Sequence, residues 1–245
     1  MRASITLSEL TISDSTKVAL PEKGVVLFVG PNNAGKSQAL RDLAKIVTSQ
    51  DSGVVILEAK MDHAGTSEDL LETLQQDQAI VRSATSGDRV DLGKSGKQPV
   101  GNVLQWWSGG NHHIVSGYFV LLADTETRLL ASKPAPALNL YDKDPVMPAQ
   151  RLYERRDIET RLDQISREAF GRGLVLDTWA GGSEWALRVG EIEAPVSPRP
   201  DQGFLDSLKA LPLLHQQGDG VRSMIGLLLT LLTGHQTISL IDEPE

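Results

Sequence analysis

The 245-residue sequence contains no cysteine, few aromatic residues (4%) and no apolar run long enough to span a membrane. The missing cysteines exclude disulfides, thiolate metal ligands and a cysteine nucleophile, which suits a cytoplasmic chain. The N-terminus also lacks a basic segment followed by an apolar one, so neither secretion nor membrane spanning is indicated. We therefore expect a cytoplasmic protein with no membrane partner.

Basic side chains are in the minority, because 24 Lys and Arg stand against 32 Asp and Glu, for a formal net charge of -8. The overall field repels phosphate backbones, which argues against a general nucleic-acid coat protein and leaves a localised DNA contact open. The apolar fraction of 40% and the charged fraction of 23% are ordinary for a globular protein. This length fits one α/β domain with an insertion, or two small lobes.

The most informative stretch is Gly30-Pro31-Asn32-Asn33-Ala34-Gly35-Lys36-Ser37, which follows an apolar run at 25–29. Its pattern G-x-x-x-x-G-K-[ST] is typical of a phosphate-binding loop, in which backbone N–H groups at the start of a helix cradle a polyphosphate. Lys36 would reach the β- and γ-phosphates, and the Ser37 hydroxyl would ligate Mg²⁺. We include Gln38, in the first helical turn, among the residues expected to contact the nucleotide.

The surroundings of this loop predict a nucleotide-binding α/β core. Alternating residues at 5–20 predict two antiparallel strands, and the uninterrupted apolar run 25–29 predicts a strand covered on both faces. Helical periodicity then favours a helix with one buried face, and 54–57 reads as a further short strand. The apolar positions of that helix are Leu40, Leu43, Ala44 and Val47.

The middle of the chain is less specific. We expect a helix capped around Ser67-Glu68-Asp69, an exposed loop up to Pro99, and a strand pair at 114–122 and 128–131. A long helix at 149–170 follows, and its matched acids and bases favour a solvated face over a DNA-binding stripe. A hairpin is predicted from 174–179 and 184–189. Trp106-Trp107 favours a buried or interface pair over a base-stacking site.

A second chemical site is predicted where the apolar strand 237–241 runs into Asp242-Glu243-Pro244-Glu245. A carboxylate at the end of a strand is where Mg²⁺ in a phosphate-loop protein needs its outer support, so Asp242 would hold the metal directly or through water. Glu243 would polarise the attacking water as a general base.

A glycine-rich turn, Gly218-Asp219-Gly220-Val221-Arg222-Ser223, enters an apolar helix at 224–232. Free N–H groups at such a turn form a second anion site, while the alternative is a turn that only caps a buried helix. One nucleotide cannot easily use both this turn and the phosphate loop. We therefore expect Gly218, Gly220 and Ser223 to contact the nucleotide of a partner.

These three motifs together resemble an ABC-type ATPase head, and more narrowly the AAA-family ATPases related to OLD (overcoming lysogenization defect) and SMC-like proteins. The resemblance implies a head that binds ATP and Mg²⁺ and forms a homodimer around two nucleotides. Such a head acts on an effector, with a nuclease or DNA as the implied partner, in DNA repair or anti-phage defence. The alternatives are a nucleotide-sensing module that does not hydrolyse ATP and, at lower rank, a transporter ATPase subunit.

Two departures from the family pattern are visible. Gly218 stands where the signature usually has a serine, and the family normally continues past the acidic motif to a switch histidine. The expectation is therefore a chain that is incomplete at its C-terminus, able to bind ATP and poor at turning it over.

The fold expected from this resemblance is an α/β P-loop NTPase, an ABC-ATPase-like head with a mixed central sheet, an antiparallel β lobe and a helical insertion. Its core would come from 1–60 and about 171–245, with the insertion at about 61–170.

Overall fold

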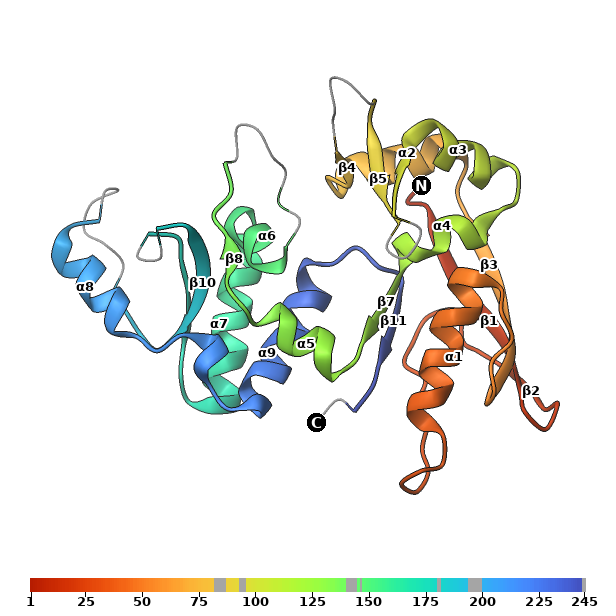
Figure 1. Cartoon of the computed structure of the whole chain (residues 1–245), viewed down its shortest axis with the longest axis horizontal. Coiled ribbons are helices and arrows are strands. Elements are labelled where there is room, and N and C mark those ends of the chain that lie inside the picture. The colour runs from red at the N-terminus through yellow and green to blue at the C-terminus, as the bar shows by residue number, and fades with distance from the viewer. Residues whose placement is uncertain are drawn as a thin grey trace. The chain divides into compact units, whose positions relative to one another are not determined.

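The structure is a computed structural model, and it describes residues 1–81, 87–92, 96–139, 145, 147–179, 182–193 and 200–243. The chain divides into two compact units: unit 1 is Met1–Ala123 with His235–Glu243, and unit 2 is Asp124–Gly234 (Figure 1). The boundaries therefore differ from the predicted core and 61–170 insertion. In the described part of the chain, no helix has the length and apolar character needed to cross a membrane.

Unit 1 contains the phosphate-loop motif and the acidic motif. Its elements are β1 (Ser4–Ile12), β2 (Lys17–Ala19), α1 (Lys36–Ser49), β3 (Ile56–Ala64), α2 (Ser67–Gln76), β4 (Ile80–Val81), β5 (Arg89–Asp91), β6 (Lys97–Pro99), α3 (Val100–Ser108), α4 (His112–Phe119), β7 (Val120–Ala123) and β11 (Ile238–Ile241).

Three small sheets form among the described residues of unit 1. The order β2-β1-β3 is antiparallel, β4-β5-β6 is antiparallel, and β11 pairs with β7 in parallel, with Ile241 opposite Ala123. The predicted antiparallel pair at 5–20 is confirmed as β1 and β2. The described residues form these separate sheets instead of the predicted single mixed central sheet.

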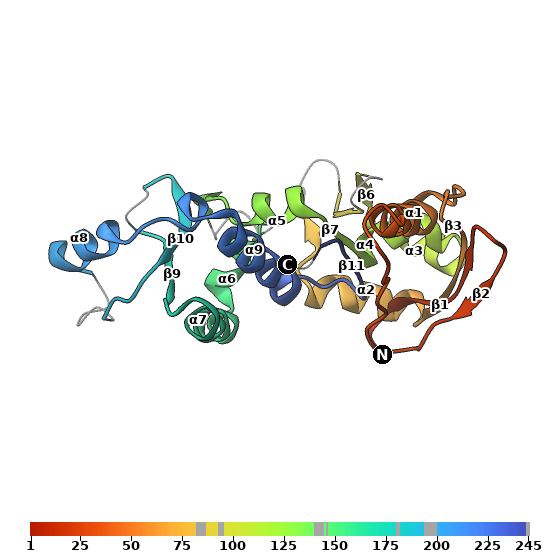
Figure 2. The ribbon, with the colours of Figure 1, turned by 90° about the horizontal axis from the view of Figure 1, so that it is seen from below.

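Helix α1 is the centre of the unit 1 core. It packs against β3, β7, β11 and α4, and Figures 1 and 2 show it lying across one face of the β1–β3 sheet. Leu43, Ala44 and Val47 are buried as predicted, and Leu40 is partly buried. The buried side of α1 faces Ile5 and Ile56, both fully buried, so the amphipathic pattern of the helix is satisfied by the β1–β3 sheet.

Residues 25–29 do not form the predicted doubly covered strand. Val25, Leu27 and Val29 are 86%, 75% and 87% exposed, and only Phe28 packs on the core. Within the described residues no strand pairs with this run. An apolar run becomes a covered strand only where a neighbouring strand is available to pair with it. The strand predicted at 54–57 does form, but it begins at Ile56 and extends to Ala64, where it pairs with β1.

Several predictions for the middle of unit 1 are corrected by local hydrogen bonds. Thr66, not Ser67, caps α2, because its hydroxyl accepts from the Asp69 N–H at 3.2 Å while Asp69 accepts from the Thr66 N–H at 2.7 Å. The predicted exposed loop before Pro99 contains β5, where Val90 is fully buried. Residues 82–86 and 93–95 of that loop lie outside the described part of the chain.

Unit 2 has a separate core built on α9. Its elements are α5 (Thr125–Ala131), β8 (Ala135–Pro136), α6 (Pro148–Glu154), α7 (Arg156–Phe170), β9 (Leu174–Asp177), β10 (Glu184–Val189), α8 (Gln202–Ala210), the 3-10 helix η2 (Leu214–Gln216) and α9 (Asp219–Thr233). The sheet order is β8-β10-β9, all antiparallel.

The predicted strand pair at 114–122 and 128–131 is wrong. The first segment is α4 followed by the short strand β7, and the second lies in α5. Asp124 explains the second error, because its carboxylate accepts from the Thr127 N–H at 2.8 Å and so starts a helix at what reads as a hairpin turn.

The long helix predicted at 149–170 is two helices, α6 and α7, which meet at Arg155. Arg155 has a non-helical backbone (φ -115°, ψ 67°), and its guanidinium binds the Asp157 carboxylate at 3.0 and 2.9 Å. Arg167 pairs with Asp163 at 2.9 Å, so the predicted solvated face of paired charges is confirmed at these residues. The predicted hairpin is also confirmed, as β9 and β10.

Candidate functional site

The phosphate-loop motif leads directly into α1. Asn33 and Gly35 have left-handed backbones, with φ of 64° and 85°, and Gly35 is the N-cap of the helix. A Cβ on Gly35 would lie only 3.0 Å from the Val55 side chain. Both the backbone angle and the close approach therefore require glycine at this position.

The start of α1 presents unused donors. In the described part of the chain, the N–H groups of Gly35, Lys36 and Ser37 have no hydrogen-bond acceptor. No acidic residue stands in the first turn of this 14-residue helix, so its positive dipole end is not neutralised. Together these features would allow the loop to bind an anion.

Lys36 closes over its own loop. Its Nζ donates to the Gly30 carbonyl oxygen at 2.8 Å and to the Pro31 carbonyl oxygen at 2.9 Å. Pro31, Asn32, Asn33 and Ala34 are exposed around it. The ammonium group is therefore held at the loop by two weak acceptors that phosphate oxygens can replace with stronger, charge-assisted bonds.

The acidic motif follows β11 in the same unit. The Asp242 N–H donates to the Ala123 carbonyl oxygen at 3.2 Å, which continues the parallel pairing by one residue. Asp242 is half-buried, whereas Glu243 is exposed and has a left-handed backbone with φ of 48°. Pro244 and Glu245 lie outside the described residues.

The fold of unit 1 places the two motifs at one end. Helix α1 packs against β7 and β11, and Figure 1 shows the end of β11 and the start of α1 at the same lower edge of the unit. This edge is where the carboxyl ends of the parallel strands meet, and ligands of open α/β sheets bind at such an edge. The described structure therefore brings residues about two hundred positions apart to one edge.

Two oxygen donors at this edge fit a magnesium ion. The Ser37 hydroxyl and the Asp242 carboxylate have no hydrogen-bond partner among the described residues. Magnesium takes oxygen ligands and usually keeps waters and substrate phosphates in its shell, so two protein donors suffice. No group of three His, Asp or Glu side chains in the described ranges could hold a metal on its own.

The glycine-rich turn lies in unit 2, where Gly218 is the N-cap of α9. Cβ atoms added to Gly218 or Gly220 would meet nothing within 4 Å, and neither glycine has a positive φ. Neither internal packing nor backbone conformation therefore requires glycine at these two positions. Ser223 is 7% exposed, and Arg222 donates to Asp219 at 2.8 Å over the first turn.

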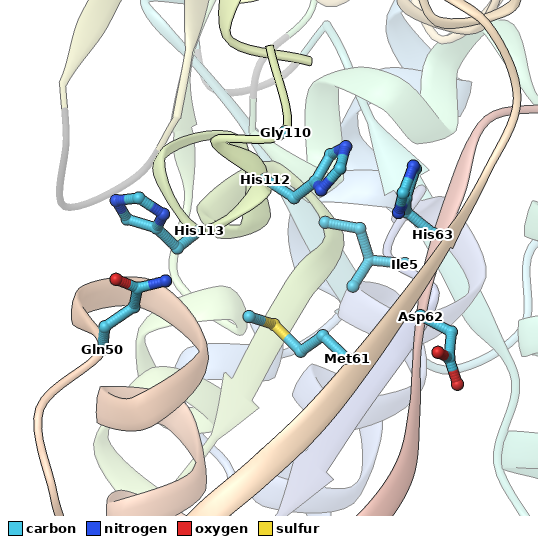
Figure 3. A pocket seen from close by; sticks show the side chains of 8 residues that line it. All are labelled: Ile5, Gln50, Met61, Asp62, His63, Gly110, His112 and His113. Carbon is cyan, nitrogen blue, oxygen red and sulfur yellow. The ribbon is translucent and has the colours of Figure 1, made fainter. Parts of the chain in front are cut away.

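Sequence reasoning missed a second hollow, at the other end of α1. It has a volume of about 200 Å³ and is lined by Ile5, Gln50, Met61, Asp62, His63, Gly110, His112 and His113 (Figure 3). His63 and His112 stack with ring centroids 3.5 Å apart, and both contact Trp107 edge-on. Trp107 itself is 3% exposed and donates from Nε1 to the Gly65 carbonyl oxygen, which confirms the buried interpretation of this tryptophan.

The stacked histidines predict acid sensitivity of unit 1. Burial is the main cause that lowers the pKa of His112 from its ordinary value of 6.5, and the charges of His63 and His113 lower it further. The unfolded chain therefore binds a proton more readily, and the stability that this site contributes above pH 6.5 is lost as the pH falls through the folded pKa.

We expect the melting temperature to fall between pH 7.5 and pH 5.5, and to fall less in His112→Phe, which keeps an aromatic ring without a titrating group. His215→Gln, which removes a histidine of unit 2, is the control and should show the same fall in melting temperature as the parent. An identical pH dependence in His112→Phe and the parent would contradict this account.

Comparison with known proteins gives one distant similarity. The chain is 28% identical over 151 residues to the achromobactin transport ATP-binding protein CbrD of Dickeya dadantii (strain 3937). The matched region is 60% of this chain and 54% of that protein, so the chain spans about half the length of the relative it matches. No family model matches the chain, and no solved structure matches it. The similarity suggests an ABC ATPase-like P-loop domain and hints at ATP binding.

Proposed function

We propose that the chain is an ATP-binding and ATP-hydrolysing head that uses Mg²⁺ and works as a homodimer. The observation that carries this proposal is the edge of unit 1, where the unused N–H groups of α1 and the acidic end of β11 lie at the same end of the unit. Gly30, Pro31, Asn32, Asn33, Ala34, Gly35, Lys36, Ser37 and Gln38 would hold the phosphates.

The roles of the side chains follow from their chemistry. Lys36 would exchange its two loop carbonyls for β- and γ-phosphate oxygens, and Ser37 and Asp242 would hold Mg²⁺. The metal, when bound, neutralises charge that develops on the phosphates. Glu243 would accept a proton from the attacking water.

The glycine turn of α9 supports the dimer. Gly218 and Gly220 are glycines that the chain's own packing does not need, which fits a surface that another backbone or a phosphate approaches closely. We propose that Gly218, Gly220 and Ser223 of one head meet the nucleotide bound by the second head. Ser223 is buried in this structure, so its hydroxyl would need a small rearrangement of the turn to take part.

Loss of the Lys36 ammonium tests nucleotide binding. We expect Lys36→Ala to raise the Kd for MgATP by about 10- to 100-fold, because charge-assisted hydrogen bonds contribute about 1.5–3 kcal/mol. Lys45→Ala is the matched control, since Lys45 lies on the same helix, is exposed and only pairs with Asp51 at 3.6 Å. Calorimetric titration of both variants measures the effect, and equal affinities would contradict the proposal.

The distant similarity favours a transporter ATPase subunit as a second candidate, because the matched protein is named as a transport ATP-binding protein. The first candidate acts instead on an effector such as a nuclease or DNA, as its sequence resemblance implies. Cell fractionation distinguishes them: a transporter subunit would sediment with membranes, and an effector-linked head would remain in the supernatant.

A further inference from the structure

The carboxylate of Asp42 is enclosed behind the phosphate-binding loop. Asp42 lies in the second turn of α1 and is 2% exposed. Its Oδ2 accepts from the N–H groups of residues 54–56 at 2.8, 2.7 and 3.2 Å, and its Oδ1 accepts from Gln38 Nε2 at 2.7 Å. Four donors therefore surround one buried acid.

The electrostatics keep this acid ionised. Burial alone would raise the pKa of Asp42, but the hydrogen bonds from Val55, Gln38 and the other two backbone N–H groups outweigh it and hold the pKa below its ordinary value. The anion and the segment before β3 thus stabilise each other at neutral pH.

The turn before β3 leaves no freedom around the carboxylate. A Cβ on Gly53 would lie 2.2 Å from the Ile56 carbonyl oxygen and 2.4 Å from the Asp42 carboxyl carbon. The backbone therefore wraps Asp42 at a distance that only glycine permits. Such a close wrap fixes residues 54–56 relative to α1.

This fixed turn supports the phosphate-binding loop. A Cβ on Gly35 would lie 3.0 Å from the Val55 side chain. Val55 therefore packs directly against Gly35, the left-handed N-cap of α1, and forms the wall behind it. Gln38, held by Asp42, lies in the first helical turn beside Ser37. Asp42 therefore constrains the N-terminal turn of α1 in two ways: it fixes Val55, which packs against Gly35, and it binds the Gln38 side chain in the first turn.

We propose that Asp42 is a positioning residue for the phosphate-binding loop, which holds the N–H groups of Gly35, Lys36 and Ser37 ready for a polyphosphate without touching it. A preorganised donor set binds more tightly, because the cost of ordering the loop is met during folding. The proposal rests on the proposed nucleotide site, and it adds that a residue which does not contact the nucleotide controls the affinity of that site.

The test compares Asp42→Asn with a core variant of similar stability cost. Asn has one acceptor oxygen where Asp has two, and it carries no charge. The N–H groups of residues 54–56 and Gln38 Nε2 therefore cannot all keep their present acceptors, the bonds that remain are no longer charge-assisted, and we expect the turn to loosen. Leu70→Ala is the control, since Leu70 is fully buried in α2. At a temperature where both variants stay folded, we expect the Kd for MgATP and for pyrophosphate to rise about 10-fold or more in Asp42→Asn only.

A nucleotide-free readout separates this proposal from the proposed function. Backbone order parameters of residues 34–38 should fall from about 0.85 towards about 0.6 in Asp42→Asn and stay unchanged in Leu70→Ala. Unchanged order parameters in a folded Asp42→Asn would overturn the positioning role, whether or not the parent protein binds ATP. A parent that binds no ATP, with the order parameters behaving as expected, would overturn only the nucleotide site.

Val55→Ala gives a milder variant for the case that Asp42→Asn does not fold. It removes the wall behind Gly35 and keeps every hydrogen bond of Asp42. We expect it to weaken MgATP binding by about threefold, in line with the loss of a small packed contact, and to raise the mobility of residues 34–38. A rigid loop with the parent's affinity in Val55→Ala would contradict the proposal.

Discussion

Glu243→Gln is expected to leave MgATP binding unchanged and to slow single-turnover hydrolysis by about 100-fold or more, the usual contribution of a general base. Glutamine keeps the size of the side chain and removes the group that would accept the proton from water. The measurement is release of phosphate from a single turnover of ATP on excess protein. Glu22→Gln, at another exposed glutamate, is the matched control and should hydrolyse at the parent rate.

The result also separates an ATPase from a sensor. Hydrolysis at the parent rate in Glu243→Gln would remove Glu243 from the mechanism. Tight MgATP binding with no phosphate release in the parent protein would favour the sensing module, which would assemble with a partner only when ATP is bound. The exposure of Glu243 in this structure means that a second head or another partner would have to enclose the attacking water.

Asp177→Ala is expected to have the largest effect on stability, and to act on unit 2. Arg188 Nε donates to Asp177 at 2.6 Å, and the two side chains are 8% and 1% exposed. Arg188 also donates to the carbonyl oxygens of Lys209 and Leu211, so it ties β10 to the end of α8. Removing the acid leaves a buried, uncompensated cation, which costs about 3–5 kcal/mol.

Hydrogen exchange measures this loss segment by segment. Protection of β9 and β10 should fall by about 100-fold or more in Asp177→Ala, the factor that corresponds to about 3 kcal/mol. Asp157→Ala breaks an exposed pair with Arg155 and should change protection little, because such pairs contribute about 0–1 kcal/mol. Similar protection in the two variants would contradict the structural role given to the buried pair.

Local patterns with a strong chemical constraint could be predicted from the sequence. The glycines and lysine of the phosphate loop, the amphipathic α1 and the short strand before Asp242 were recognised because each needs a fixed spacing of residue types. The structure places α1 and β11 as predicted. The roles of the individual side chains stay predictions.

Long-range pairing could not be predicted in the same way. The run 25–29 is apolar enough for a covered strand, but whether a strand is covered depends on a partner elsewhere in the chain. Strand β7 was read as part of a longer hairpin strand, although it pairs in parallel with β11 more than a hundred residues away. Asp124 shows the opposite case, in which a local interaction sets the structure: its carboxylate caps the N-terminus of α5, where the sequence predicted a turn between strands.

Asp42 and the histidine hollow escaped sequence reasoning for a related reason. An acid within an amphipathic helix is normally read as part of the solvated face, and only the turn at Gly53 encloses Asp42. The stack of His63 on His112 joins β3 to α4, which share no local sequence signal. A signal for Asp42 was present in its spacing, because it lies between the buried residues Ala39 and Leu43.

The central claim is that the N-terminal turn of α1 binds the phosphates of a nucleotide. Hydrogen exchange of the segment 30–38 tests it most directly, because the backbone N–H groups of Gly35, Lys36 and Ser37 have no acceptor in the described structure. MgATP should slow exchange in this segment, and adenosine with Mg²⁺ should not. Exchange in 30–38 that is the same with and without saturating MgATP would contradict the account.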